Sequence, residues 1–242
     1  MPPLFDARAL AASFALALAV PGGAEAGAWP RAKGETFLSF GQQTSTGATT
    51  LLGAVTDIRT WNSVYAEHGV TERLTVGLDA GLGFGQDQRV ETALAFARLP
   101  VWSPGDHRVA VDFGLGTLAI TDEATQTRIR LGVAWGRGLA PSPRRWMREG
   151  GWLGMEASGE LREPAGEIAW KADFTAGLKP NDRWMLIAQV QTGYYPDVGG
   201  IVRLAPSVVR KISERAQVQL GVTAEVVGEP ALGVSGALWL EF

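Results

Sequence analysis

Apolar residues alternate with small or polar residues along most of the chain beyond residue 33. From Leu74 to Phe84 every second residue is apolar, and the positions between them hold threonine, aspartate and glycine. The same period of two recurs over residues 109–116, 128–136 and 217–226. This period is typical of a β-strand, in which successive side chains point to opposite faces of the sheet. Such runs exceed the ~5–6 residues of an ordinary strand and match the ~9–11 residues with which a tilted strand crosses a bilayer.

The alternation predicts twelve strands, joined by connections of two kinds. The strands cover residues 34–43, 58–68, 72–85, 88–99, 107–120, 125–137, 150–162, 167–178, 183–195, 200–211, 215–227 and 231–242. Short turns dominate one side, although the connection at 138–151 is longer and rich in proline and arginine. The other side carries the long segment 43–57. Because the number of strands is even, both chain ends lie on the side of the short turns.

The residues between the apolar positions discriminate between two folds that share this alternation. A soluble sandwich points its polar set at water, whereas a membrane barrel points its apolar set at lipid and the other set at its lumen. Here the second set is mainly Gly, Ala, Ser, Thr and Gln, while a water-facing surface is normally richer in Lys and Glu. We therefore predict an all-β protein: a closed, antiparallel, up-and-down transmembrane β-barrel of about 12 strands over residues 27–242.

The end of the chain supports closure of this barrel. Leu238, Leu240 and Phe242 would share one face of the last strand. Because lipid offers no hydrogen-bond partners for an open sheet edge, the last strand must pair with the first. Short turns are typical of the periplasmic side of such barrels, so we expect both chain ends there.

The N-terminus has the pattern of a secretory signal peptide. Residues 9–20 are apolar, follow Arg8, and are too few to cross a bilayer as a helix, which needs ~20 residues. The small-x-small sequence Ala24-Glu25-Ala26 provides a cleavage site. We predict residues 1–26 to be a signal peptide that is removed after Ala26 during export to the cell outer membrane; a buried N-terminal helix is the alternative.

Composition excludes several other classes of protein and site. The chain contains no cysteine, which excludes a disulfide framework, thiolate metal ligands and cysteine nucleophiles. Its net charge of -3 does not fit a polybasic nucleic-acid binder, so no nucleic-acid partner is expected. The glycine-rich segment 81–86 is not followed by a helix, and no dense calcium-binding loop is present. We predict no cofactor and no metal site.

Charged residues of the second set are candidates for the lining of a solute path. They are Asp79, Asp112, Arg128, Arg130, Glu156, Lys171, Asp173, Arg203 and Glu225. With Glu91 counted, acids outnumber bases, so a wet lumen should mildly prefer cations. The acids are also candidates for carboxylate pairs, Asp79 with Asp112 and Glu156 with Asp173, although a ladder of hydrogen-bonded charges is the simpler interpretation. The inward face of strand 88–99 stays ambiguous, because Glu91 is at an odd and Arg98 at an even position, so the two residues have opposite parity and point to opposite faces of the strand.

Aromatic residues near the ends of the predicted strands suggest two girdles at the membrane interfaces. One comprises Phe40, Phe84, Trp170, Tyr194 and Tyr195, and the other comprises Trp102, Trp135, Trp146, Trp184 and Phe242. By parity, Trp61, Trp152 and Trp239 belong to the lumen set instead.

The histidines give little support to catalysis. A serine–histidine dyad needs a histidine near a serine and a third group that orients it. The two histidines, His68 and His107, both fall at short turns, so we predict no catalytic residues and no enzyme.

Two segments resemble a known type of protein. The ending GALWLEF (236–242) is similar to the C-terminal signal of Gram-negative outer-membrane proteins, and YAEHGVTERLTVGLDAGLGF (65–84) resembles the strand–turn–strand repeat of transporter-like and phenol-degradation-pathway-like outer-membrane barrels. The resemblance implies insertion into outer-membrane lipid by the assembly machinery, through Phe242, and passage of small molecules.

These observations predict a passive channel or transporter for small solutes. The alternatives are a structural or surface-interaction barrel with a closed lumen and, third, a lipid-modifying enzyme. Twelve strands give a backbone diameter of roughly 24 Å and leave a lumen on the order of 10 Å. The lumen would be filled if residues 44–57 folded inward or if the charged ladder spanned it, and no plug domain is expected before the first strand.

Overall fold

A computed structural model describes residues 27–47, 58–85, 88–196 and 199–242 of the chain. The predicted signal peptide, its cleavage site and most of segment 44–57 lie outside these residues. Within them, no helix is long and apolar enough to cross a membrane.

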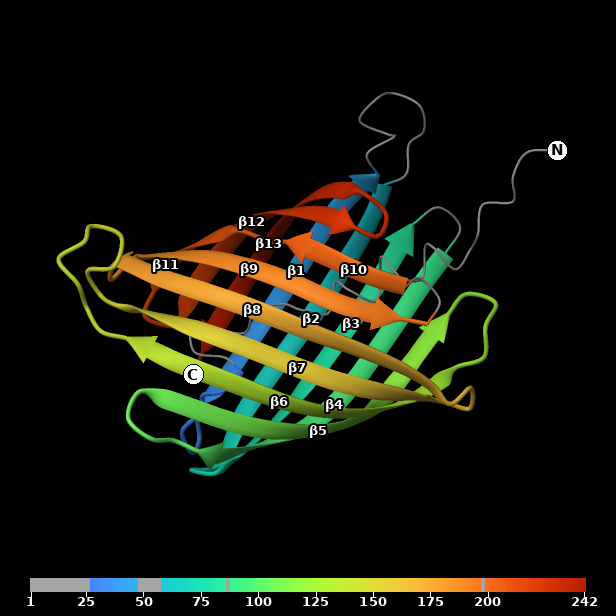
Figure 1. The fold of residues 1–242 in the computed structure, drawn as a ribbon, viewed down its shortest axis with the longest axis horizontal. Coiled ribbons are helices and arrows are strands. Elements are labelled where there is room, and N and C mark those ends of the chain that lie inside the picture. The colour runs from blue at the N-terminus through green and yellow to red at the C-terminus, as the bar shows by residue number, and fades with distance from the viewer. Residues whose placement is uncertain (1–26, 48–57, 86–87, 197–198) are drawn as a thin grey trace.

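The described residues form one antiparallel sheet that closes on itself (Figure 1). Its strands are β1 (Thr36–Gly47), β2 (Ile58–Thr71), β3 (Leu74–Gly85), β4 (Gln88–Trp102), β5 (His107–Ile120), β6 (Gln126–Leu139), β7 (Gly151–Glu163), β8 (Glu167–Asn181), β9 (Trp184–Tyr195), β10 (Gly199–Leu204), β11 (Ser207–Ser213), β12 (Ala216–Val227) and β13 (Ala231–Glu241). We call the end at which β1 begins and β13 ends the terminal end, and the opposite end the loop end.

β10 and β11 are two halves of one position in the barrel wall. Both pair with β9 and with β12, and their register against β9 is continuous from Leu204 opposite Val190 to Ser207 opposite Ile187. Pro206 lies between them, and proline has no backbone N–H to donate to a neighbouring strand. The predicted strand 200–211 is therefore interrupted once, and the barrel has the predicted twelve strands around its circumference.

The first and last strands seal the barrel, as the sequence predicts. β1 and β13 pair over their whole length, from Phe37 opposite Glu241 to Gly47 opposite Ala231. At the terminal end, Thr36 N donates to Phe242 O at 3.1 Å, and Phe242 N donates to Thr36 O at 3.0 Å. The C-terminal residue is therefore held in the sheet by two backbone hydrogen bonds.

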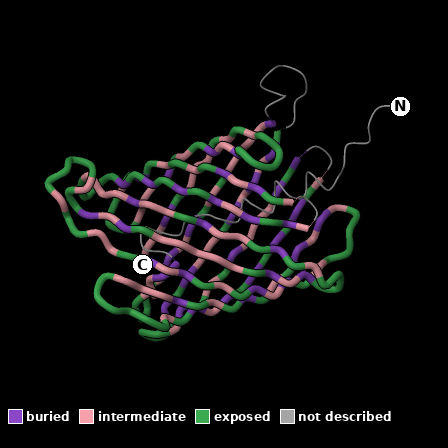
Figure 2. Tube along the Cα trace, in the orientation of Figure 1, coloured by how far each residue is buried: buried purple, intermediate pink, exposed green. Residues whose placement is uncertain are grey.

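The outer surface is apolar and the inner surface is not. Buried and exposed positions alternate along the strands (Figure 2), and large apolar side chains are exposed on strands all around the barrel. Leu131 on β6 and Leu220 on β12, which lie far apart around the wall, are each 65% exposed. A closed barrel with such a surface faces lipid, because an apolar outside and a polar inside are what a membrane barrel requires.

Two aromatic assignments can be checked against this division. Trp61, Trp152 and Trp239 are buried on the inner side, as their parity predicts. Tyr195 is also buried, so its predicted place in the lipid-facing girdle with Phe40, Phe84, Trp170 and Tyr194 is wrong. Tyr195 shares the inward parity of Gln191 on β9, whereas its neighbour Tyr194 is exposed on the outside.

β4 shows which of its two faces points inward. Arg98 is buried inside, together with Leu94 and Phe96. Glu91 points outward and forms an ion pair with Arg89 at 2.7 Å, both side chains being more than half exposed. The inclusion of Glu91 among the lumen acids is therefore wrong, because the period of two places Glu91 and Arg98 on opposite faces.

Glycines on the inner face make room for inward-pointing rings. A side chain on Gly81 would overlap the ring of Trp61, and a side chain on Gly177 would overlap the ring of Trp152. This explains the many small residues in the inner set, because each ring occupies the space above a glycine.

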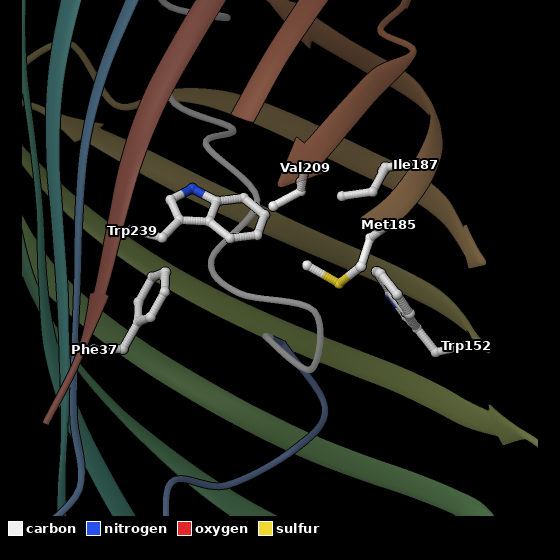
Figure 3. Close-up of a cluster of buried hydrophobic side chains, with 6 residues drawn as sticks. All are labelled: Phe37, Trp152, Met185, Ile187, Val209 and Trp239. Atoms are coloured by element: carbon white, nitrogen blue, oxygen red, sulfur yellow. The ribbon is translucent and has the colours of Figure 1, made fainter. Parts of the chain in front are cut away.

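An apolar cluster crosses the lumen toward the terminal end. It comprises Phe37, Trp152, Met185, Ile187, Val209 and Trp239. Figure 3 shows the ring of Trp239 pointing toward Val209, with the side chain of Met185 between Trp239 and Trp152. The interior of the barrel is therefore not polar throughout.

Candidate functional site: the lumen

Residues 27–35, which we call the N-terminal strap, enter the barrel through residues 27–31, whereas residues 32–35 are exposed at the terminal end. Ala28 is fully buried, and a side chain on Gly136 of β6 would overlap Trp29. Gly27 lies directly against the carboxylate of Glu156 on β7. Trp29 also packs against the apolar cluster. The strap therefore extends into the lumen from the terminal end and reaches the β6–β7 wall.

The strap is fixed to the opposite wall by Arg31. Its Nε donates to Glu67 Oε2 at 2.8 Å, its backbone N donates to Thr75 Oγ1 at 3.1 Å, and its guanidinium lies 4.6 Å from the centre of the Phe37 ring. The prediction was that no separate plug domain precedes the first strand, and the strap is a short segment and not a domain. It nevertheless occupies lumen space that the prediction assigned to residues 44–57 or to charged side chains.

Glu67 on β2 is the centre of a buried ion network. Its side chain is fully buried and accepts hydrogen bonds from Arg31, from Arg98 Nη1 at 2.5 Å and from Tyr65 Oη at 2.6 Å. A buried carboxylate is stable only with such compensation, because desolvation of an unpaired charge costs several kcal/mol. Glu67 therefore holds together β2, β4 and the strap.

Inward-facing ion pairs cover the wall from β3 to β8, which together with Glu67 we call the charged wall. Glu160 accepts hydrogen bonds from Arg128 Nη2 at 2.6 Å and from Arg162 Nε at 3.0 Å. Arg130 lies between Asp112, at 3.2 Å, and Asp79, at 3.7 Å. The proposed pair Asp79–Asp112 is thus bridged by an arginine.

The second proposed carboxylate pair is brought together by strand register. Glu156 on β7 lies directly opposite Asp173 on β8. Lys171 approaches Asp173 to 3.7 Å. Like charges placed opposite one another across two strands are destabilising, so the neighbouring lysine offsets a local excess of negative charge.

The expected excess of lumen acids is wrong. Arg31, Arg59, Arg98 and Arg162 all reach the interior, whereas Glu91 does not. Two further acids, Glu67 and Glu160, do not restore the excess. The predicted preference for cations rested on that excess and therefore loses its basis.

The opposite wall runs from β9 through the seam, which is the pairing of β13 with β1, to β2. Midway between the two ends of the barrel it has a different chemistry, and we call it the uncharged wall. It presents the amides of Gln43, Gln189, Gln191 and Gln219. It also presents the hydroxyls of Ser63, Ser207, Thr223 and Ser235. Toward the loop end of this side, Arg203 donates to Glu225 at 3.0 Å and Arg59 donates to Glu229 at 2.8 Å, and at the terminal end Lys211 and Glu241 line the mouth.

Three cavities follow the lumen. At the terminal end a mouth of about 490 Å³ is lined by charged residues, including Arg31, Lys179 and Glu241. Beyond the apolar cluster, a cavity of about 60 Å³ lies along the uncharged wall and one of about 30 Å³ lies along the charged wall. A water molecule needs ~10–15 Å³ of such space, so the inner cavities hold water but no large solute.

The nine residues suggested as a solute path all lie on the inner face, buried or half-buried. Their part in such a path stays a prediction. The predicted site did not include Glu67 and Glu160, which carry the two shortest ion pairs, nor Arg162, which pairs with Glu160 at 3.0 Å, nor the amides of the uncharged wall. The signal was parity, since Glu160 and Arg162 share the face of Glu156 on β7.

The histidines lie near the terminal end, away from the inner cavities. His68 Nδ1 is 2.9 Å from Thr36 Oγ1, and the Trp135 Nε1–H donates to His107 Nδ1 at 3.2 Å. Within the described ranges of the chain, no group of three or more histidine and acidic side chains is arranged to hold a metal ion.

The fold is shared with outer-membrane proteins of solved structure. An outer-membrane channel from Pseudomonas putida F1 is 12% identical, with a TM-score of 0.66 over 92% of this chain and 99% of that chain. The KdgM porin, solved in complex with disordered oligogalacturonate, is 6% identical, with a TM-score of 0.57 over 85% of this chain and 99% of that chain. The chain has the fold of an outer-membrane β-barrel.

The same fold also serves proteins of a different kind. The translocator domain of the autotransporter NalP from Neisseria meningitidis is 14% identical, with a TM-score of 0.56 over 97% of this chain and 96% of that chain. The chain matches no protein-family model and no curated protein. The similarity confirms the predicted fold, and function has to be argued from the lumen.

Proposed function

We propose that the protein is an outer-membrane channel for small polar solutes, narrowed in this structure by the N-terminal strap. The observation that carries this proposal is the polar lining on either side of the apolar cluster, at the charged mouth and along both walls from the inner cavities to the Arg203–Glu225 pair. Lipid cannot reach these groups, so the polar inner face has no role in holding the barrel in the membrane. A path for polar solutes would account for the polar inner face.

A barrel with a permanently closed lumen is the second candidate. It is favoured by the apolar cluster of Phe37, Trp152, Met185, Ile187, Val209 and Trp239 and by the small volume of the inner cavities. The two candidates differ in what the strap does. In a channel its removal widens the path, whereas in a closed barrel the side chains of the wall still block it.

Conductance of the refolded protein in a planar lipid bilayer tests the proposal. We expect steady, small current steps from the unmodified protein. Replacing Trp29 and Arg31 together by alanine removes the packing and the ion pair that hold the strap, and should raise the unit conductance roughly twofold or more. Lys33→Ala is the matched control, because Lys33 is exposed on the same segment.

Absence of conductance would establish the closed barrel. If neither the unmodified protein nor the double variant conducts, while both are folded by heat-dependent mobility on gels, the channel is excluded. Equal conductance of the double variant and Lys33→Ala would show that the strap does not narrow the path.

We further propose that the mature chain begins at Gly27 and resides in the outer membrane. The exposed apolar surface of the barrel supports a membrane location. Intact mass measurement on protein purified from the outer-membrane fraction should match residues 27–242. Recovery in a soluble fraction, or a mass that includes residues 1–26, would contradict this proposal.

Recognition of Phe242 by the assembly machinery is a separate proposal. Phe242 also bonds to Thr36, so its deletion has two possible effects. Removal of Phe242 should lower the amount of folded barrel in cells while refolding into detergent micelles proceeds normally. If refolding in vitro fails to the same extent, the residue acts through the seam and not through recognition.

A further inference from the structure

The cavity along the uncharged wall differs from the rest of the lumen in one respect. None of the described residues that line it carries a charge, although charged side chains line both the mouth and the cavity on the opposite wall. With about 60 Å³ it is also twice the size of the charged-wall cavity. This cavity is therefore polar but uncharged, unlike the charged mouth, the charged-wall cavity and the apolar cluster.

The groups in this cavity both donate and accept hydrogen bonds. Gln219 Nε2 donates to Ser207 Oγ at 2.8 Å, and Gln189 Nε2 donates to Thr175 Oγ1 at 3.1 Å. A primary amide has two N–H donors and an oxygen that accepts two bonds, so these contacts use only part of the capacity of each side chain. Gln191 Nε2 also donates to Gln189 Oε1 at 2.8 Å, so these amides are linked along the wall, and all of them line the cavity.

Charge and polarity restrict what this wall can bind. A charged solute would lose water without meeting an opposite charge, since the nearest ion pair, Arg203–Glu225, is internally matched at 3.0 Å. An apolar solute would leave buried amides and hydroxyls without water, which costs about 1–3 kcal/mol for each such group. The wall therefore selects solutes that are neutral and carry many hydrogen-bonding groups.

Trp61 adds one apolar surface to the cavity. Its indole lines the cavity and lies over Gly81. A flat aromatic ring beside amides and hydroxyls suits a molecule with C–H groups on one side and hydroxyl groups on the other.

We infer that the uncharged wall is a binding site for small, uncharged, polyhydroxylated solutes, of the size of glycerol or a four-carbon polyol. This inference rests on the proposed channel function and names its solute class. The cavity holds space for about four water molecules. A small polyol replaces such waters with hydroxyl groups that satisfy the same amides.

The experiment compares erythritol with erythronate, in which a carboxylate replaces one terminal alcohol group. Ion current through the protein in a planar bilayer is recorded as each solute is added. Erythritol should reduce the current with a saturable dependence on its concentration, and erythronate should not. Gln219→Leu and the isosteric Thr223→Val should each raise the half-blocking concentration about fivefold, the expected effect of one lost hydrogen bond. Gln126→Leu, on the other wall, is the matched control and should leave it unchanged.

Calorimetric titration in a detergent without a sugar headgroup measures binding independently of conduction. Saturable erythritol binding that weakens in Gln219→Leu and Thr223→Val supports the site, even if the protein does not conduct; in that case only the channel function fails. A protein that conducts but shows neither saturable block nor binding overturns the inference and retains the channel. Equal block by erythronate, or a loss of current that follows only solution viscosity, also overturns it.

Discussion

The two walls of the lumen differ in chemistry, while their outer faces are alike. On the charged wall, β6 points Arg130 inward and Leu131 outward. On the uncharged wall, β12 points Gln219 inward and Leu220 outward, and both leucines are equally exposed. Lipid therefore imposes the same requirement on every strand, and the inner residues vary independently of it. The difference between the walls reflects what the lumen contacts and not what the fold needs.

The walls also use different kinds of bonds. The charged wall consists of matched ion pairs, such as Arg128 with Glu160, and one of its acids holds the strap. The uncharged wall consists of neutral hydrogen bonds between side chains, such as Gln219 with Ser207. Loss of one partner is costly on the first wall and modest on the second, because an unpaired buried charge is destabilised more than an unpaired amide.

The largest effect is expected at Glu67. Glu67→Leu leaves Arg98 buried without its acid and Arg31 with only Glu241 at 4.0 Å, and should lower the free energy of unfolding by about 3–5 kcal/mol. Gln219→Leu on the uncharged wall should cost about 1–2 kcal/mol. Urea unfolding in lipid vesicles, followed by tryptophan fluorescence, measures both. Equal losses would remove the energetic distinction between the walls.

The next largest effect concerns the outer faces and should be the same on both sides. Leu131→Arg and Leu220→Arg each place a charge in the middle of the lipid-facing belt, at a cost of about 2–4 kcal/mol. Ile58→Arg, at the loop end of β2, should cost only about 0–1 kcal/mol. The same unfolding assay applies. A clear difference between the two leucine variants would mean that one of these faces is covered by something other than lipid.

A smaller effect is expected where a ring from one strand covers a glycine on the next. Gly81→Ala forces a methyl group into the space of the Trp61 ring and should cost about 1–3 kcal/mol. Gly159→Ala on β7 meets nothing within 4 Å and should be neutral or stabilise by about 0.5 kcal/mol. Thermal unfolding midpoints compare the two. If Gly81→Ala is as well tolerated as Gly159→Ala, the rings are not packed as described.

The smallest effect concerns ion selectivity and separates the walls by function. Glu160→Gln removes one negative charge from the lumen beside Arg128 and Arg162 and should raise the ratio of chloride to potassium permeability about twofold. Reversal potentials in a potassium chloride gradient measure this ratio. Glu91→Gln removes the same charge from the outer surface and should change nothing. An identical shift in both variants would show that selectivity is not set inside the lumen.

Most of the fold could be predicted from the sequence because one simple rule governs it. A period of two fixes both the strand and its inward face, so the inward tryptophans follow from parity. The pairing of the last strand with the first follows from the lack of hydrogen-bond partners for an open sheet edge in lipid. The girdle assignment failed where a residue was placed by its position along the strand and not by its parity. Tyr195 was assigned to a girdle because it lies near a strand end, although its parity with Gln191 points inward.

The lumen was less predictable because its contacts join distant parts of the chain. Residues 27–35 have no periodic pattern, and the pair Arg31–Glu67 depends on the path of the strap and not on local propensity. The uncharged wall likewise exists only after closure brings Gln43 on β1 beside the amides of β9 and β12. Parity locates such residues on the inner face, but their grouping requires the closed ring.

The strap continues directly into β1 at Thr36, so the segment inside the lumen is a short tethered peptide and not a strand of the barrel. A tether of this length keeps its own binding groups at an effective concentration on the order of millimolar beside the lumen. Weak contacts are then enough to keep it in place most of the time. A solute that enters the lumen therefore competes with the strap for the same space. Its passage becomes fast only when its concentration outside the barrel approaches the effective concentration of the strap.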